Sequence, residues 1–484
     1  MLRVLLGAGL VLGLAGCAAT HQSKVGESTV DLGHGRLQDA IVKVDNQLRT
    51  GNPGDLLLNL EKGELLRIAG QYGDSMSAFE TADTSVKQWE ETARGTLSEV
   101  ASQVGATILG DGNRTYEAQD YEKVMLTTVM ALNRLSQGDL ENARVDIKRT
   151  HEREALIAEY RARQTEAAEE KAKEEGAQTK QQDLKGYPIE TLNDPEVLAL
   201  KNGYQNALSH YLSGFVYEVL NEPSLAAPGY RQAIELRPDS PVLEQGLSGL
   251  SERGAQQRGN GQTDVLFVIE AGNAPARESR KFMFPVPTGS GIAMVGMSYP
   301  VISPIAEVES MSKISVGETT LPVSLVADFN VMARRALKDD LPGMQTRAAV
   351  RMVAKAAAQV VAQKEGGLIA GLIANVAAVV AEPPADDRLW RTLPGRVYVA
   401  RGFMPAGDYA LTLPGVAQAP QKISVSGRHM IVPLRMYPAV TYLGEAGRFG
   451  ELAKQAVVDE PAPKKRGAKR AAPPKAPEKS ALLQ

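Results

Sequence analysis

The sequence predicts a two-part α + α/β protein, in which an all-helical first half is followed by a β-rich half with inserted helices. Three observations support this prediction. Residues 36–253 carry helical patterns, separated by turn signals such as Gly138-Asp139. At 254–263 Gly and Gln replace the apolar residues, which indicates a linker between domains. Short runs of strand type then follow over 264–437, the predicted β-rich α/β domain.

The N-terminus has the pattern of a secretory signal peptide over residues 1–16. Arg3 supplies a positive charge, and Val4–Leu14 are apolar or Gly throughout. A run of about 11 residues is too short to span a bilayer. The run ends in Leu14-Ala15-Gly16-Cys17, which resembles the lipobox of bacterial lipoproteins. That resemblance implies cleavage before Cys17 and a lipid on its sulfur atom.

Cys17 is the only cysteine among 484 residues, and it lies where a lipobox requires it. A plain signal peptide with an incidental cysteine is the alternative. Two or more acyl chains hold a protein stably on a membrane. Ala18, rather than Asp, follows the cysteine, which resembles lipoproteins that are sent to the outer membrane and face the periplasm. Residues 17–35 are small and polar and are predicted to form a lipidated tether.

Repeat-like spacing occurs within the helical half. One set of residues has offsets of 0, 3, 12, 16, 19 and 24, which match the tetratricopeptide repeat (TPR) consensus. In that consensus small residues let two helices approach, aromatic residues fill the groove beside them, and proline ends the unit. The set comprises Gly214, Tyr217, Ala226, Tyr230, Ala233 and Pro238.

Two weaker copies of this spacing extend the prediction to a TPR-like helical solenoid over 36–253. One copy shares offsets 16 and 19, although Ser75 stands where Ala is usual, and the other shares offset 12. A generic helical bundle, in which these residues are ordinary packing positions, is the alternative. The two copies comprise Gly63, Phe79 and Ala82, and Ala131 and Ala143.

A charged helix is predicted from Leu140 to Glu175, because its charges alternate in sign among Ala residues. It is interpreted as the solvated side of a helix pair, with an arm that projects to bind a partner as the alternative. At the other end of the chain, residues 438–484 are predicted to form a disordered basic tail rich in Pro, Ala and Lys.

The β-rich half contains a helical insertion, predicted at 328–338 and 344–382. Within it, 366–381 are 16 uncharged residues with a GxxxG pattern. Such a run reaches about 24 Å as a helix, short of the roughly 30 Å hydrocarbon layer. We therefore predict a buried helix, with membrane insertion or oligomeric pairing as the alternative. Strands are predicted at 264–269, 281–286, 292–297, 305–308, 314–316, 321–327, 396–400, 408–413, 422–425 and 429–434.

Few residues suit catalysis, metal binding or nucleic-acid binding. The 54 Lys and Arg residues nearly balance 57 Asp and Glu residues, so no global basic field points to nucleic acid. A single cysteine excludes internal disulfides and Cys-ligated zinc, and no phosphate-binding loop occurs. Adjacent carboxylates such as Asp339-Asp340 and Asp386-Asp387 rarely share a site, and His210 is interpreted as a packed residue. We therefore predict no catalytic residue, no metal and no cofactor.

Motifs in both halves together resemble a family of poorly characterised TPR-containing proteobacterial lipoproteins. The resemblance implies no established enzymatic role, and it implies cell-wall assembly as the context. The motifs are Tyr121-Glu122-Lys123-Val124-Met125, Gly138-Asp139 with Ala143-Arg144-Val145, Tyr211-Leu212-Ser213-Gly214, Glu270-Ala271-Gly272-Asn273-Ala274-Pro275 and Trp390-Arg391-Thr392-Leu393-Pro394.

The first functional hypothesis is a non-enzymatic scaffold, anchored by lipid to the outer membrane, that binds protein partners of the envelope. Trp390 is either a core residue or an interface anchor. An envelope enzyme acting on glycan or peptide is the second hypothesis, and it predicts a deep cleft where carboxylates converge. A membrane-interacting component that uses 366–381 is the third.

Overall fold

The computed structural model describes residues 21–95, 115–174, 187–253, 261–288, 291–305, 311–344 and 384–452. Several predicted features lie outside these ranges. They are the signal peptide and Cys17, most of the linker, the helix predicted at 344–382 apart from Met344, which includes the uncharged run at 366–381, and the tail beyond residue 452.

The first half is helical, as predicted, and a further helical stretch covers 329–344 in the second half. The long charged helix is present over Leu140–Glu174, and residues 175–186 lie outside the described ranges. The helices are α2 (His21–Gly33), α3 (Leu37–Thr50), α4 (Leu56–Ile68), α5 (Tyr72–Ala93), α7 (Asp120–Ser136), α8 (Leu140–Glu174), α9 (Pro195–Ala199), α10 (Ala207–Val219), α11 (Pro223–Leu236) and α12 (Pro241–Ser248).

The second half supplies the strands. They are β1 (Gln262–Ala271), β2 (Arg277–Thr288), β3 (Gly291–Ile302), β4 (Lys313–Val316), β5 (Thr319–Asp328), β6 (Arg396–Pro405), β7 (Gly407–Thr412), β8 (Gln421–Val425), β9 (His429–Met436), β10 (Thr441–Leu443) and β11 (Gly447–Phe449). With the exception of 305–308, each predicted strand overlaps one of these elements. Ile305 is not in a strand, and 306–310 lie outside the described residues.

Nine of the described strands form one large sheet in the order β10-β9-β1-β6-β5-β4-β7-β8, with β11 added on β9, and β2 and β3 pair with each other as a separate ribbon. Neighbours are antiparallel except β1 and β9, which are parallel. The sheet curls until its two ends approach each other. A hydrogen bond joins these ends, in which Arg448 of β11 donates from Nη2 to the carbonyl oxygen of Ser424 in β8 (3.1 Å). The sheet is therefore nearly closed.

The central strand β1 is buried on both faces. Val265, Phe267 and Ile269 point into a core enclosed by the sheet itself. Leu266 and Val268, which alternate with them, belong to a core shared with the helices. A strand that is covered on both faces has a continuous run of apolar residues. The run at 264–269 predicted β1 for this reason.

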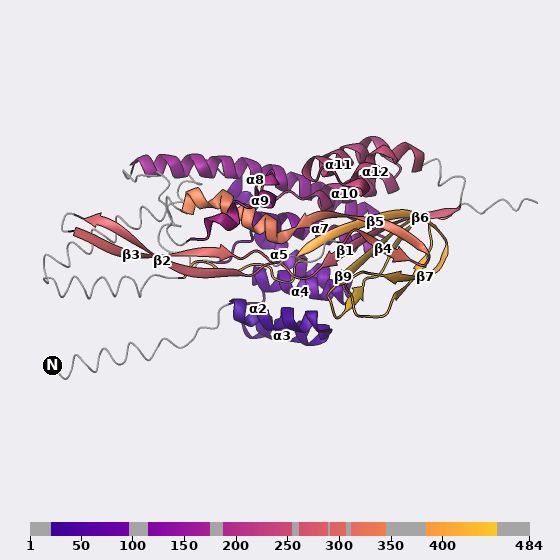
Figure 1. Cartoon of the computed structure of the whole chain (residues 1–484), viewed down its shortest axis with the longest axis horizontal. Coiled ribbons are helices and arrows are strands. Elements are labelled where there is room, and N and C mark those ends of the chain that lie inside the picture. The colour runs from indigo at the N-terminus through magenta and orange to yellow at the C-terminus, as the bar shows by residue number, and fades with distance from the viewer. Residues whose placement is uncertain are drawn as a thin grey trace, which may run out of the picture.

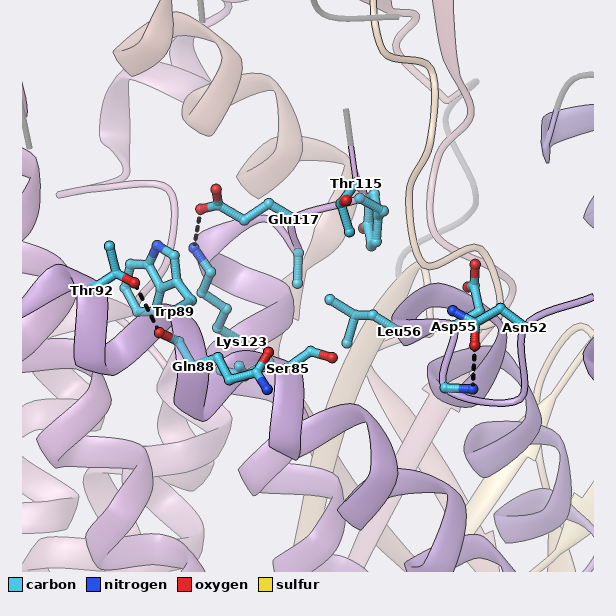
Figure 2. A pocket seen from close by; sticks show the side chains of 14 residues that line it. Asn52, Asp55, Leu56, Ser85, Gln88, Trp89, Thr92, Thr115, Glu117 and Lys123 are labelled. Carbon is cyan, nitrogen blue, oxygen red and sulfur yellow. Dashed lines mark hydrogen bonds and ion pairs between the residues drawn. The ribbon is translucent and has the colours of Figure 1, made fainter. Parts of the chain in front are cut away.

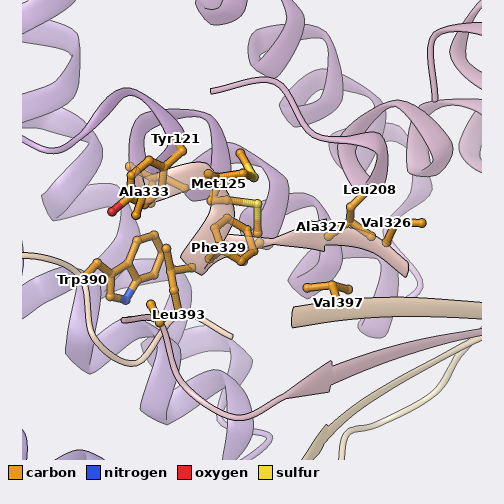
Figure 3. Close-up of a cluster of buried hydrophobic side chains, with 14 of the residues drawn as sticks. Tyr121, Met125, Leu208, Val326, Ala327, Phe329, Ala333, Trp390, Leu393 and Val397 are labelled. Atoms are coloured by element: carbon orange, nitrogen blue, oxygen red, sulfur yellow. The ribbon is translucent and has the colours of Figure 1, made fainter. Parts of the chain in front are cut away.

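Helices of the first half supply part of the core of the second. Figure 3 shows Tyr121 and Met125 of α7 close to Phe329 and Trp390. The architecture is mixed α + β, and the second half is not the plain β-rich domain that was predicted. The prediction missed this packing because hydrophobic periodicity tells which face of an element is buried but not what covers it.

Close helix pairs occur where the repeat spacing predicts them. A Cβ atom on Gly63 of α4 would lie 2.5 Å from the ring of Phe79 in α5. The same atom on Gly214 of α10 would lie 2.6 Å from the ring of Tyr230 in α11. Both pairs have the same sequence offset of 16, so α4–α5 and α10–α11 pack alike. Ser75, which replaces the usual Ala, donates from Oγ to the carbonyl oxygen of Gly63 (2.6 Å).

Substitution of Gly214 tests this packing. We expect Gly214→Leu to lower the free energy of unfolding by about 1–3 kcal/mol, because the added atoms overpack the α10–α11 contact. Gly73 of α5 is the matched control, since nothing lies within 4 Å of a Cβ placed there. Gly73→Leu should be neutral or should stabilise by up to about 1 kcal/mol. Urea unfolding measures both, and equal stabilities of the two variants would contradict the packing.

The predicted tether is largely a helix. Residues 21–33 form α2, and Val25 and Leu32 are fully buried. The hydroxyl of Tyr442 donates to the carbonyl oxygen of Leu32 (2.7 Å). The local sequence is polar, but residues near Tyr442 cover its few apolar side chains. The prediction of a tether was therefore wrong over residues 21–33.

The start of the predicted tail is also ordered. Residues 438–452 contain β10 and β11, both paired with β9. Their apolar residues Val440 and Tyr442 pack against the cluster between α2, α3 and α4. The prediction of disorder was therefore wrong for 438–452, because these residues gain their burial from helices some 400 positions earlier in the chain.

The molecule is elongated in Figure 1, with the large sheet toward one end and a ribbon of β2 and β3 projecting at the other. Helix α8 runs along one side. Among the described residues, no helix combines the length and the apolar character needed to cross a membrane.

Candidate functional site

A pocket of about 300 Å³ opens where α4 begins, α5 ends and α7 begins. Figure 2 shows Trp89 and Lys123 on one side and Asp55 and Leu56 on the other. The walls thus come from three helices and from the segment 115–118. Polar side chains such as Gln88 contribute much of the lining.

Lys123 forms the charged centre of one wall. Its Nζ atom lies 2.9 Å from Glu117 Oε1 and 3.0 Å from Asp120 Oδ1. The same atom lies 3.5 Å from the ring centroid of Trp89, which is a cation–π contact. The side chain of Lys123 is only 2% exposed, so these three partners replace the water that its charge has lost.

The charges in this wall keep their ordinary ionised states. Burial alone would raise the pKa of Asp120, but Arg161 and Lys123 outweigh burial and lower it to about 2. Burial would lower the pKa of Lys123, yet Glu117 and Asp120 raise it above its ordinary value. The wall therefore stays charged over the physiological pH range.

Trp89 leaves one hydrogen-bond donor unused. Its ring packs edge-on against Tyr160, with centroids 5.5 Å apart. The Nε1 atom is buried and has no hydrogen-bond partner among the described residues. A buried donor without a partner costs free energy, and Trp89 is one of the residues that line the pocket.

The carboxylates that line the pocket are already engaged. Asp55 caps α4 by accepting the backbone N–H of Leu58 (2.9 Å). Glu117 pairs with Lys123, although about half of its side chain remains exposed. The pocket therefore offers hydrogen bonds and one partly open carboxylate.

Two buried glutamates behind the pocket clamp a segment of the second half. Glu122 of α7 accepts the backbone N–H of Trp390 (2.7 Å) and the hydroxyl of Tyr116. Glu61 of α4 accepts the backbone N–H groups of Arg391 (2.6 Å) and Thr392 (2.9 Å). These bonds join the first half to residues 390–392.

Burial dominates the acidity of both glutamates. It raises the pKa of Glu61 to about 7 and that of Glu122 to about 7, against the opposing effect of the donated hydrogen bonds. The Trp390 side chain, next to the backbone groups that the two carboxyls hold, is fully buried. It is therefore a core residue rather than an exposed interface anchor.

A second ionic group joins α10 to the sheet. Arg401 of β6 donates from Nε to Asp264 Oδ1 in β1 (2.9 Å) and from Nη1 to the hydroxyl of Tyr230 (2.8 Å). It also donates to Glu218 of α10 (3.0 Å). Burial alone would raise the pKa of Asp264, but Arg401 and His429 hold it far below its ordinary range.

The TPR-type residues take structural positions. Ala226, Tyr230 and Ala233 are fully buried, and Gly214 contacts the ring of Tyr230. Tyr217 is half-buried, and Pro238 is exposed just after α11 ends. Tyr230 is placed by the repeat spacing, but its bond to Arg401 was not predicted.

His210 is packed, as expected. Its ring stacks on His151 with centroids 4.6 Å apart, and its Nε2 atom lies 3.0 Å from Glu154 Oε2. Burial, helped by His210, lowers the pKa of His151 to about 4. Within the described part of the chain, no group of three or more His, Cys, Asp or Glu side chains is placed to hold a metal ion.

The adjacent carboxylates do not converge on the pocket. Asp340 pairs with Arg161, Asp339 with Arg335 (2.9 Å), and Asp386 with Arg388 (2.8 Å). The pocket residues Trp89 and Lys123 were not singled out from the sequence. Lys123 stands within one of the resemblance motifs, but a lone Lys on a helix gives no signal of burial.

No protein-family model, no curated protein and no solved structure matched the chain.

Proposed function

We propose that the chain is a lipid-anchored lipoprotein of the outer membrane that faces the periplasm and acts as a non-enzymatic TPR-like scaffold. Lipid on Cys17 would hold it at the membrane. Its ligand would be a protein of the envelope, in the context of cell-wall or envelope assembly, and neither a cofactor nor nucleic acid takes part.

One observation carries the binding role. The pocket formed by α4, α5 and α7 is lined by Trp89, whose buried indole N–H has no partner among the described residues, and it has an exposed rim of polar groups. These groups suit a peptide segment, because backbone carbonyl oxygens accept from an indole N–H and backbone N–H groups donate to a carboxylate such as Glu117. The close helix pairs α4–α5 and α10–α11 support the TPR-like part of the proposal.

The alternative of an envelope enzyme requires carboxylates that are free to exchange protons with a substrate. Asp55 and Glu117 in the pocket serve instead as a helix cap and as an ion-pair partner. Their geometry favours binding over catalysis.

Photo-crosslinking in the native envelope tests the binding role. A photoreactive amino acid replaces Gln88, which is exposed at the rim of the pocket. We expect a discrete envelope protein to be crosslinked, because a ligand in the pocket would lie against this position. Asp74 is the control, since it is exposed on the same helix about 21 Å along the axis. The same products from both positions would refute a ligand-specific pocket.

A separate variant tests the lipid anchor. Cys17→Ala should abolish the incorporation of labelled fatty acid and release the protein from the membrane fraction. Unchanged labelling would refute lipidation at Cys17, whatever is captured through position 88.

A further inference from the structure

Three buried donor groups without partners occur near the junction of the two halves. They are the hydroxyl of Tyr121 in α7, the Nε atom of Arg277 in β2 and the Nη1 atom of Arg391. None of these atoms has a hydrogen-bond partner among the described residues. Together the three residues form the Tyr121 cluster. None of them lines the pocket of α4, α5 and α7, so the cluster is a separate place in the fold.

Contacts between three segments bring the cluster together. Tyr121 precedes Glu122, which accepts the backbone N–H of the residue just before Arg391 (2.7 Å). Arg391 donates from Nε to the carbonyl oxygen of Ala274 (3.2 Å), and Ala274 lies three residues before Arg277. Burial and Glu122 raise the pKa of Tyr121 well above its ordinary value, whereas the two arginines act to lower it. Both guanidinium groups therefore lie within electrostatic reach of the hydroxyl group.

The two arginines of the cluster lack a counter-charge. No described carboxylate lies within ion-pair distance of Arg277 or Arg391. Glu61 accepts the backbone N–H of Arg391 rather than its side chain (2.6 Å), and Asp386, whose charge acts near Arg277, pairs with Arg388 (2.8 Å). Charged groups that are removed from water are usually paired. Every buried arginine that the structure describes does pair with a carboxylate, and these are Arg67, Arg153, Arg253, Arg334, Arg401 and Arg435.

The cluster is closed on one side and open on the other. Tyr121 is only 1% exposed, and its ring lies beside that of Phe329, with centroids 6.2 Å apart (Figure 3). Arg277 and Arg391 are each partly exposed. Solvent therefore reaches the guanidinium groups, while Tyr121 closes the cluster from the inside. Because its pKa is raised, the hydroxyl of Tyr121 keeps its proton at neutral pH and can donate it to an acceptor.

We propose that the Tyr121 cluster binds the carboxylate group of a ligand. A carboxylate has two oxygens with about four acceptor positions, so it can accept from all three donors. It also supplies the counter-charge that both arginines lack, which an ordered water does not. A doubly charged phosphate fits less well, because Glu61 and Glu122 already place negative charge near the arginines. This binding site goes beyond the proposed scaffold role and does not depend on it.

Thermal unfolding of the full chain in non-ionic detergent tests the site, with sodium acetate as the probe. Sodium chloride replaces sodium acetate at constant ionic strength, so that only the effect of the carboxylate is measured. We expect acetate to raise the melting temperature of the wild type, because a ligand that binds the folded state stabilises it. We expect Tyr121→Phe and Arg277→Gln each to raise the acetate dissociation constant about tenfold or more, because each removes one bond to the bound group.

The variants also have to be intact without the probe. Neither Tyr121→Phe nor Arg277→Gln should lower the melting temperature in chloride alone, because neither side-chain group has a bond to lose. Arg280→Gln is the matched control, since it removes the same charge from an exposed position of the same strand. It should keep the wild-type response to acetate.

Tri-alanine distinguishes two sources of the carboxylate. Tighter binding of tri-alanine than of acetate would assign the site to the end of a peptide chain, and equal binding would assign it to a small organic acid. Tri-alanine with an amidated C-terminus should not bind.

Four outcomes overturn the proposal. They are equal stabilisation of the wild type by acetate and chloride, equal binding of the free and amidated peptides, an unchanged acetate dissociation constant in either variant, and a lower melting temperature of Tyr121→Phe in chloride alone. The last outcome would mean that the hydroxyl already bonds to ordered water. Capture through position 88 reports on the pocket alone, so the two proposals fail separately.

Discussion

Replacing Arg401 with Met should lower the free energy of unfolding by about 3–5 kcal/mol. The Arg401 side chain is 5% exposed and bonds to Asp264, Glu218 and Tyr230 at the contact between α10 and the sheet. Methionine fills a similar volume but leaves Asp264, which is fully buried, without its main counter-charge. An uncompensated buried charge is what makes this substitution costly.

Urea unfolding of the two proteins at neutral pH measures the effect of this substitution. Arg428→Met is the matched control, because Arg428 is exposed on the chain just before β9. The control should stay within about 0.5 kcal/mol of the wild type. A loss below about 1 kcal/mol for Arg401→Met would show that Arg401 does not hold the helices to the sheet.

Stability should fall as the pH rises from about 5 to about 7.5, and Glu61 and Glu122 should account for much of the fall. Burial raises the pKa of each carboxyl from 4.5 to about 7 in the folded protein. Between these values the folded state binds more protons than the unfolded state, so stability decreases with pH. The contribution is complete below pH 4.5, declines through pH 7 and is absent above it.

Each carboxyl contributes about 3 kcal/mol over this range. Asp146, whose pKa burial raises to about 6, acts in the same direction. His151, whose pKa falls to about 4, acts in the opposite direction, because the unfolded chain takes up a proton that the folded protein resists. The comparison of variants, rather than the wild-type slope alone, therefore isolates the two glutamates.

Glu61→Gln and Glu122→Gln remove the titration but keep one acceptor oxygen. Both variants will be less stable than the wild type at pH 5. In each variant the new side-chain NH₂ group can face a backbone N–H that donated to the carboxyl group, and two donors cannot bond to each other. The decisive quantity is the difference in free energy of unfolding between pH 5 and pH 7.5. That difference should shrink in each variant and most in the double variant. A slope equal to that of the wild type would mean that both carboxyls titrate at their ordinary pKa.

Local patterns were sufficient to place most elements. The apolar run at 264–269 became β1, and the charged stretch from Leu140 became α8. The spacing from Gly214 to Tyr230 predicted a close helix pair. Two helices pack this closely where a glycine on one faces an aromatic ring on the other, and this pairing recurs at a fixed sequence offset. These features depend on residues near one another in sequence, so the sequence alone carries them.

The pocket and the ionic contacts followed from no local pattern. Glu61 meets Arg391 across 330 positions, and Asp264 meets Arg401 across 137. The same holds for α2, whose polar sequence predicts a tether, because the hydroxyl that bonds to Leu32 belongs to Tyr442, which is 410 positions away.

The sequence by itself determined the helical and β-rich halves, the main strands and the helix pairs. Only the tertiary structure decided that the two halves share a core, that Trp390 is buried between them, and that Lys123 lines a pocket. The physical reason is that hydrophobic period and turn chemistry act over a few residues. Burial of a charge, and the pKa shift that it causes, exist only once distant segments have removed the water around it.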